Sequence, residues 1–375
     1  MGCKLNMVKL RPRSFHLQWH ITERCNLSCK HCYQDPVLIK NELEISDLIG
    51  ILENFIKQIK IWDLPKEAVR ISFTGGEPFI KKGFWKLLQK CYQNRDKFRY
   101  GILTNGTFLD EKIAEKLKKL KVSYVQISLE GTKKTNDYLR GKGVFEKGIK
   151  GIRLLKNKGI EANLSMTVSK VNLKDVPAMI KLCRKLNVSL GIRRLIPSGH
   201  GQVLKKFILI PQEVKSFWHY VQKMRQNYGD RVGLGCEDGM MVQDFPSYIP
   251  GYCTAGYLSL TILPNADVYP CRRLPILVGN LLKESFESIY NNSKPLKKLR
   301  NLNNINDVCF SCPYREKCQG GAKCLAFSYF NDIAAPDPQC WRLFKKLTDP
   351  KLKWKNSSQQ RPERLNFKWA ERNNS

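Results

Sequence analysis

Short apolar runs alternate with amphipathic stretches over the first two hundred residues of the chain. The runs are rich in β-branched and aromatic residues, which favour strands. Between them, apolar residues recur at intervals of three and four, which is the spacing of a helix with one buried face. The pattern predicts strands at 15–21, 69–73, 100–103, 124–129, 162–168 and 190–196, and helices at 45–59, 84–94, 110–120, 145–159 and 173–187.

Strands that alternate with helices indicate successive βα units around a parallel sheet. Six such units predict an α/β fold with a partial (β/α)6, TIM-like barrel, open where eight units would close it. In folds of this kind the chemistry takes place at the carboxyl ends of the strands. We therefore expect the functional residues in the loops that follow each strand.

The sequence pattern changes after the predicted barrel, which indicates further domains. We expect a lead-in at residues 1–14, the barrel at 15–207, and a bridging helix and linker at 208–250. Short strands, turns and cysteines predict a cysteine-rich domain at 251–346. Residues 347–375 are rich in Lys and Arg and predict a basic tail that packs poorly.

The composition limits the partners of the protein. No run of 18 apolar residues exists, so no membrane span or secretory leader is expected, and we interpret the protein as cytoplasmic with no membrane partner. The net charge of +32 would attract anions such as acidic peptides. Because the lysines are scattered and no basic motif is interleaved with aromatic residues, no nucleic-acid partner is expected.

Fourteen cysteines are many for a cytosolic chain, in which clustered thiols more often bind metal than form disulfides. The first group is Cys25, Cys29 and Cys32, spaced by three and then two residues. Zinc sites usually have four ligands. Iron-sulfur clusters are held by thiolates, and three thiolates leave one iron of a four-iron cluster free to bind a small molecule. The spacing therefore favours an iron-sulfur cluster with an open position.

The segment WHITERCNLSCKHCYQ resembles the signature of the radical S-adenosylmethionine (radical SAM) superfamily, and the resemblance spans residues 17–201. It implies a [4Fe-4S] cluster on Cys25, Cys29 and Cys32, with S-adenosylmethionine (SAM) on the free iron. In that family the reduced cluster cleaves SAM to a 5′-deoxyadenosyl radical, which abstracts a hydrogen atom from the substrate.

The same resemblance implies that SAM contacts come from the ends of successive strands. His31 takes the place of the aromatic residue before the last cysteine. The segment FTGGEP grips the methionine amino group, SLEG surrounds the ribose, and an arginine binds the methionine carboxylate. The implied SAM contacts are His31, Gly75, Gly76, Glu77, Asn105, Ser128, Glu130, Arg140 and the backbone near Leu195. No catalytic acid or base is assigned.

A second group of seven cysteines occupies the cysteine-rich segment. From the spacing alone, zinc ribbons remain possible. The order resembles the SPASM extension of some radical SAM proteins, which binds two auxiliary [4Fe-4S] clusters. It implies a nearer cluster on Cys253, Cys271 and Cys324 and a farther one on Cys309, Cys312, Cys318 and Cys340.

Two positions depart from the SPASM pattern. Ala266 replaces the usual glycine, and five residues rather than three separate Cys318 from Cys324. The nearer cluster also has only three cysteines. Its fourth position is an open iron, a ligand other than cysteine, or Cys236.

Among SPASM proteins, the resemblance favours a maturase that abstracts hydrogen from a side chain of a ribosomally made peptide or of a protein. The product would be a thioether, a carbon-carbon crosslink or an oxidised residue. Anaerobic sulfatase maturation fits less well, because Arg272 follows the second SPASM cysteine where those enzymes carry an aspartate. Side-chain removal in haem biosynthesis stays open, as does a basic iron-sulfur scaffold without activity.

The expected partners follow from this chemistry. The first cluster needs a reducing electron donor of the flavodoxin or ferredoxin type. Cys25 comes too early for an N-terminal peptide-binding domain, so the basic surface or a separate leader-binding protein would recognise the peptide leader.

Overall fold

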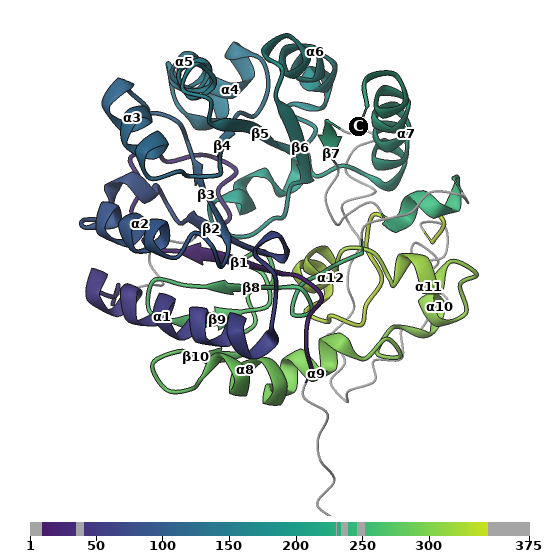
Figure 1. The fold of residues 1–375 in the computed structure, drawn as a ribbon. Coiled ribbons are helices and arrows are strands. Elements are labelled where there is room, and N and C mark those ends of the chain that lie inside the picture. Colours follow the sequence, from purple (N-terminus) through teal and green to yellow (C-terminus); the bar gives the residue numbers. More distant parts are fainter. Residues whose placement is uncertain (1–9, 35–40, 230, 234–238, 246–251, 344–375) are drawn as a thin grey trace, which may run out of the picture.

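One twisted sheet runs through the molecule (Figure 1). The computed structural model describes residues 10–34, 41–229, 231–233, 239–245 and 252–343. In this part of the chain the strands lie in the order β10-β9-β8-β1-β2-β3-β4-β5-β6-β7. They are β1 (Phe15–His20), β2 (Val69–Thr74), β3 (Arg99–Thr104), β4 (Tyr124–Ser128), β5 (Glu161–Val168), β6 (Ser189–Arg194), β7 (Val232–Gly233), β8 (Ser259–Ile262), β9 (Asp267–Tyr269) and β10 (Gly279–Asn280).

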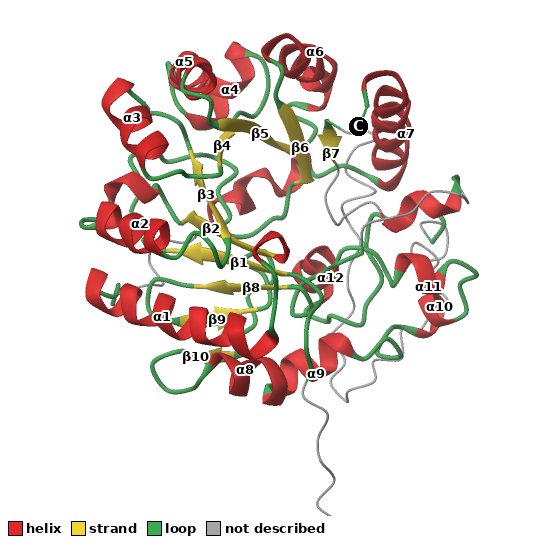
Figure 2. Cartoon of the chain, viewed as in Figure 1, coloured by secondary structure: helices red, strands yellow, loops and turns green. Residues whose placement is uncertain are grey.

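Helices flank the sheet along its length, and the helical C-terminal segment lies beside it (Figures 1 and 2). The α-helices are α1 (Ile45–Trp62), α2 (Phe84–Gln93), α3 (Glu111–Lys119), α4 (Lys133–Arg140), α5 (Val144–Asn157), α6 (Val176–Leu186), α7 (Pro211–Tyr228), α8 (Phe286–Asn292), α9 (Lys294–Arg300), α10 (Asp307–Phe310), α11 (Arg315–Cys318) and α12 (Lys323–Phe330). Short 3-10 helices are η1 (Lys66–Ala68), η2 (Pro78–Ile80), η3 (Leu173–Asp175), η4 (Gly199–Phe207) and η6 (Gly239–Gln243).

The apolar periodicity explains how the elements pack. In α1 the residues at helical spacing from Leu48 to Trp62 are buried. The ring of Phe15 on β1 lies 5.8 Å from that of Phe55 and 4.8 Å from that of Trp62. Strand β2 is buried at five of its six positions, as expected of a parallel strand covered on both faces.

The predicted α/β fold is confirmed. Strands β1 to β6 pair in parallel in chain order, and each lies within two residues of its predicted ends. The sheet is open rather than closed, as a partial barrel requires. Helix α4 was not expected, because KKTNDYLR carries few apolar residues at helical spacing.

The sheet extends further than the six predicted units. Strand β8, from the cysteine-rich segment, pairs in parallel with β1, and β7 pairs with β6 at the opposite end. These strands have four and two residues, which is too short to carry a recognisable alternation. The cysteine-rich segment therefore shares the main sheet. In the described part of the chain, no helix combines the length and apolar character that crossing a membrane requires.

Candidate active site

The first three cysteines lie in the loop that follows β1. Cys25 is exposed, Cys32 is half-buried and Cys29 is buried. Burial, together with the nearby thiols of Cys32 and Cys25, raises the pKa of the Cys29 thiol to about 11, although the Arg140 charge opposes this shift. The loop is fixed by backbone hydrogen bonds from Lys30 N to Leu139 O (2.9 Å) and from Gly201 N to Cys32 O (2.8 Å). The three thiols thus lie close together at the carboxyl end of the sheet.

Gly75 and Gly76, after β2, pack directly against the residues that precede Cys25. A β-carbon on Gly75 would overlap the carbonyl oxygen of Thr22, and one on Gly76 would overlap that of Arg24. Gly76 N donates to Thr22 O at 2.8 Å. Both glycines are therefore needed for this close approach of two backbones, whatever they contribute to SAM.

The Glu77 carboxylate joins the ends of β2 and β3. It accepts hydrogen bonds from Thr104 Oγ1 at 2.8 Å, Asn105 N at 2.9 Å and Phe79 N at 3.3 Å. Burial raises the pKa of Glu77 to about 7 despite these bonds. Asn105 Nδ2 lies 3.9 Å from Cys25 Sγ, so the loop after β3 contacts the first cysteine of the site.

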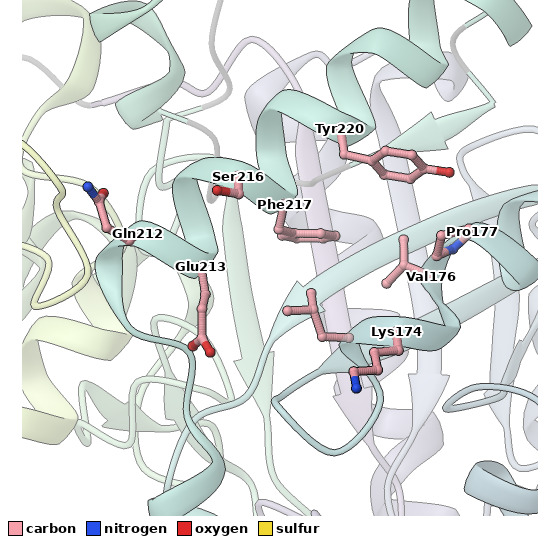
Figure 3. A pocket seen from close by; sticks show the side chains of 9 residues that line it. Lys174, Val176, Pro177, Gln212, Glu213, Ser216, Phe217 and Tyr220 are labelled. Atoms are coloured by element: carbon pink, nitrogen blue, oxygen red, sulfur yellow. The ribbon is translucent and has the colours of Figure 1, made fainter. Parts of the chain in front are cut away.

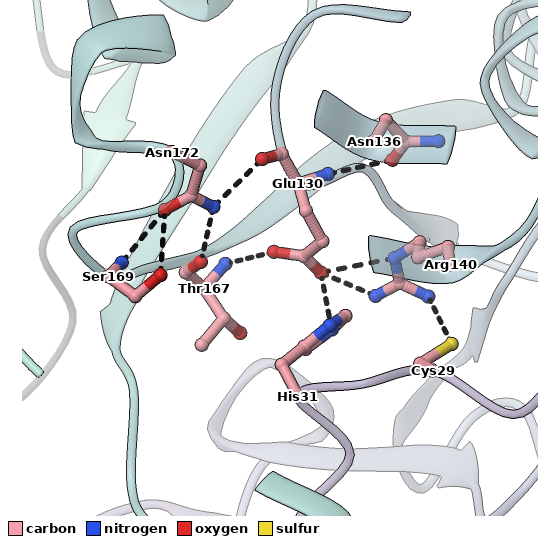
Figure 4. Close-up of polar contacts among 8 residues, drawn as sticks. All are labelled: Cys29, His31, Glu130, Asn136, Arg140, Thr167, Ser169 and Asn172. Carbon is pink, nitrogen blue, oxygen red and sulfur yellow. Dashed lines mark hydrogen bonds and ion pairs between the residues drawn. The ribbon is translucent and has the colours of Figure 1, made fainter. Parts of the chain in front are cut away.

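A buried network centred on Glu130 follows β4 (Figure 4). One carboxylate oxygen is 3.1 Å from His31 Nε2 and accepts from Arg140 Nε at 3.1 Å and Nη2 at 2.5 Å. The other accepts from Thr167 N at 2.5 Å. Burial alone would raise the pKa of Glu130, but the charges of His31 and Arg140 hold it at about 2. Arg140 Nη1 lies 3.9 Å from Cys29 Sγ, so the network reaches the cysteine loop.

The remaining implied SAM contacts lie at the ends of two other strands. Ser128 is half-buried at the end of β4. Leu195 follows β6 and is buried with Leu139, Leu204 and Ile208. Since Leu139 precedes Arg140 in α4, this apolar group lies next to the Glu130 network.

Four of the SPASM-type cysteines surround one cavity. Cys309, Cys312, Cys318 and Cys340 line it together. Burial and the thiols of Cys340 and Cys312 raise the pKa of Cys309 to about 12. Gln243 Nε2 lies 3.5 Å from Cys340 Sγ. The thiol donors suit an iron-sulfur cluster and are the four that the SPASM resemblance assigns to the farther cluster.

The other three cysteines of the segment are placed less directly. Cys253 lines a second cavity with Lys323, which precedes Cys324. Burial raises the pKa of the half-buried Tyr33, and the thiols of Cys32 and Cys271, which lie near it, raise it as well. Cys236 lies outside the described residues. Among those described, no three His, Cys or acidic side chains are close enough to bind a single metal ion.

Sequence reasoning missed a polar cluster between the two groups of cysteines. Arg272 Nη2 lies 3.7 Å from Glu23 Oε2, and the Arg272 guanidinium lies over the Tyr33 ring at 5.6 Å. Burial raises the pKa of Glu23 to about 7, although the Arg272 charge opposes this shift. His20 Nε2, both Glu23 oxygens and Arg272 Nε are buried without a hydrogen-bond partner among the described residues. A polar residue two positions before Cys25 and another directly after Cys271 were the available signals.

Arg194 fixes the end of β6 to the cysteine-rich segment. Its guanidinium makes two hydrogen bonds to Asp337, at 2.7 and 3.1 Å, and one to Gln339 Oε1 at 2.7 Å. Arg273 donates to the Arg194 carbonyl oxygen at 2.6 Å. Arg194 is therefore structural.

A pocket of about 410 Å³ lies between α7 and the η3–α6 segment (Figure 3). Phe217 and Tyr220 on α7 face Val176 and Pro177 across it. Its lining contains none of the predicted cluster or SAM ligands.

Comparisons with known proteins show the family of the chain. A family model described as the radical SAM superfamily matches residues 19–183, and an iron-sulfur cluster-binding (SPASM) model matches residues 253–313. The chain belongs to the radical SAM superfamily and carries a SPASM domain. As a radical SAM enzyme it uses SAM and a [4Fe-4S] cluster, and the SPASM domain adds auxiliary iron-sulfur clusters.

Relatives of this radical SAM enzyme match most of its length. Mycofactocin maturase MftC of Mycolicibacterium smegmatis is 28% identical over 356 residues, covering 86% of this chain and 82% of that protein. The AdoMet-dependent heme synthase of Methanosarcina barkeri is 26% identical over 347 residues, covering 86% and 95%. The structure of Streptococcus suis SuiB bound to precursor peptide SuiA has the same fold, with a TM-score of 0.70 at 18% identity over 88% of this chain and 76% of SuiB.

Proposed function

We propose that this radical SAM enzyme is a peptide maturase, which removes a hydrogen atom from a side chain of a ribosomally made peptide or of a protein. A thioether, a carbon-carbon crosslink or an oxidised residue would result. One relative that matches most of the chain is named a maturase, and SuiB, with the same fold, binds a precursor peptide. These likenesses support a peptide as the substrate.

One observation carries the proposal: the SPASM segment lies against the first cysteine loop. Cys271 and Cys32 both lie near Tyr33, and Arg272 contacts Glu23. A substrate radical formed beside the first cluster must lose an electron to become a closed-shell product. An auxiliary cluster on Cys271 would be close enough to accept it.

The proposed roles follow the contacts. Cys25, Cys29 and Cys32 would hold the first cluster and leave one iron for SAM. When bound, cluster and SAM together supply a 5′-deoxyadenosyl radical. Glu130 fixes the orientation of Arg140, whose guanidinium suits the methionine carboxylate. The further proposed SAM contacts are His31, Gly75, Gly76, Glu77, Asn105, Ser128 and Leu195.

The auxiliary ligands and the domain limits are also proposals. We assign Cys253, Cys271 and Cys324 to the nearer cluster and Cys309, Cys312, Cys318 and Cys340 to the farther one. The barrel would span residues 15–207 and the SPASM domain 251–346, around the two family matches.

The proposed setting is the reducing cytoplasm, since clustered thiols that bind iron are disfavoured in oxidising compartments. A donor of the flavodoxin or ferredoxin type would reduce the first cluster. The basic surface or a separate leader-binding protein would recognise the peptide leader.

Two assays test the proposal. Anaerobic protein with dithionite and SAM should release 5′-deoxyadenosine, and the triple variant Cys25→Ala/Cys29→Ala/Cys32→Ala should not. Coexpression with short open reading frames next to the gene should then yield a peptide that has lost hydrogen, detected by mass spectrometry. Deoxyadenosine formation with no modified peptide from any neighbouring frame would count against a peptide maturase.

A second candidate is side-chain removal in haem biosynthesis. It is favoured by the heme synthase relative, 95% of whose length is matched. The two are distinguished by incubating the reduced enzyme and SAM with an iron porphyrin that carries propionate groups. Loss of carboxyl groups from the porphyrin would support this candidate, and an unchanged porphyrin would reject it.

A further inference from the structure

A lysine ammonium group is buried between the two groups of SPASM cysteines. Lys323 is the first residue of α12 and its side chain is half-buried, but Nζ is shielded from solvent and has no hydrogen-bond partner among the described residues. Buried ammonium groups are normally paired, because a charge without a partner is costly inside a protein. The position therefore requires an explanation.

Thiols from both groups lie near Nζ, and the Asp332 carboxylate also acts on its charge without accepting a hydrogen bond from it. Cys253 lines a cavity together with Lys323, and Cys309 and Cys318 line the neighbouring cavity with Gly320. A β-carbon built on Gly320 would lie 3.2 Å from Lys323 Nζ and 4.0 Å from Cys309 Sγ. The ammonium group thus lies between a proposed ligand of the nearer cluster and two of the farther one.

The chain takes an unusual path to place Lys323 there. Gln319, Gly320 and Gly321 all have positive φ, at 53°, 81° and 75°. Asp337 fixes this turn, because its N–H donates to Gly320 O at 3.0 Å and its carboxylate accepts from Ala322 N at 3.0 Å. The turn, Ala322 and Lys323 make up the five-residue spacer between Cys318 and Cys324.

Lys323 also lies at an unfavourable position in its helix. The N-terminus of a helix carries partial positive charge, so a lysine at the first position is unfavourable there. Residues that break such rules without a local gain tend to serve a function. Thiolate-bound clusters are anionic, and they are the partners that this cation lacks.

We propose that Lys323 is a positioning residue that donates hydrogen bonds to sulfur between the two auxiliary clusters and raises their reduction potentials. A nearby positive charge and hydrogen bonds to sulfur favour the reduced state of a cluster, which carries one more electron. The inference rests on the proposed assignment of the auxiliary ligands. It makes the auxiliary clusters better acceptors for the electron released by the substrate.

The test measures potentials in a full-length protein that holds only the auxiliary clusters. The Cys25→Ala/Cys29→Ala/Cys32→Ala background removes the first cluster, so the remaining signals in an anaerobic redox titration followed by electron paramagnetic resonance belong to the SPASM domain. Into this background we would introduce Lys323→Met, Lys323→Arg and, as the matched control, Lys298→Met, which removes an exposed charge from the same domain.

Lys323→Met should keep its iron and sulfide but become harder to reduce. We expect about a tenfold shift in the equilibrium between oxidised and reduced cluster, or about 59 mV for one electron. Lys323→Arg should restore most of the potential, and Lys298→Met should not change it. If Lys323→Met lost iron while Lys323→Arg kept its iron and a normal cluster potential, the result would also support a need for the positive charge.

Two results would overturn the inference. One is an unchanged potential in Lys323→Met at full iron content. The other is loss of the auxiliary clusters in both Lys323 variants, which would mean that the shape of lysine rather than its charge is required. Failure of the proposed function is a separate outcome, because an enzyme that modifies no peptide would still show the shift in potential.

Discussion

The ion pair between Arg194 and Asp337 gives the sharpest test of how the barrel and the SPASM segment are held together. Both side chains are only 1% exposed, and the guanidinium meets both oxygens of the carboxylate. Arg194→Met keeps much of the side-chain volume and removes the charge. The Asp337 carboxylate then stays buried without its cation.

The expected loss of stability in Arg194→Met follows from the contacts of Asp337. Removing one partner of a buried ion pair costs about 3–5 kcal/mol. We expect the lower end, about 3 kcal/mol, because Ala322 N and Gln339 N still donate to the carboxylate. With an unfolding entropy of about 2.1 cal/mol/K per residue, this lowers the Tm of the 375-residue chain by about 4 °C.

The assay is urea and thermal unfolding of anaerobic protein followed by circular dichroism. Arg193→Met is the control, since Arg193 is the half-buried neighbour on the same strand, and it should cost less than about 1 kcal/mol. Arg194→Met/Asp337→Asn should be more stable than Arg194→Met, because no unpaired charge remains. If the costs of the two single substitutions simply added in the double variant, the ion-pair reasoning would be refuted.

Three further predictions concern the first cysteine loop and its supports. Gly76→Ala should lose the iron of the first cluster but keep the auxiliary iron, because the new methyl group overlaps a backbone carbonyl; normal total iron would contradict this. Burial raises the pKa of Glu77 from 4.5 to about 7. The stability that the protonated Glu77 side chain contributes is therefore fully present below pH 4.5 and is lost as the pH rises through 7. Glu77→Gln should therefore flatten the pH dependence of the urea midpoint between pH 5 and 8, and an unaltered slope would be evidence against it. Glu130→Gln leaves Arg140 without its counterion and should cost about 3–5 kcal/mol and weaken SAM binding in equilibrium dialysis, whereas full stability would argue against a charged network.

The fold was largely predictable because each βα unit carries its own signal. In strands such as Val69–Thr74 apolar residues alternate with polar ones, and helices such as Ile45–Trp62 repeat apolar residues over several turns. Cys91 and Cys183 lie in such helices and are buried in the core, as the pattern indicates. The sequence pattern does not predict β8, since four residues are too few to show a strand or which strand it pairs with.

The sequence motifs predicted which residues lie at the site, but not which side chains contact one another there. Motifs at the ends of neighbouring parallel strands must meet at one edge, so Cys25, Asn105 and Glu130 were expected near one another. The pairing of Glu130 with Arg140 depends on rotamers and on the unpredicted helix α4. The contact of Glu23 with Arg272 joins distant segments, so the polar residues near Cys25 and Cys271 did not reveal that they pair with each other.

The pairing of β8 with β1 fixes the first cysteine loop and the SPASM segment relative to each other. Strand β1 leads into the Cys25 loop, and β8 begins the path that leads through β9 to Cys271. Without β8, β1 would become an edge strand with unpaired backbone groups. The strand that orients the first cysteine loop is therefore completed by the SPASM segment, and Arg272 and Arg273 then contact Glu23 and the end of β6. Because the same segment extends the sheet beside β1 and brings the second cysteines close to the first, folding of the barrel and assembly of the reaction centre depend on each other.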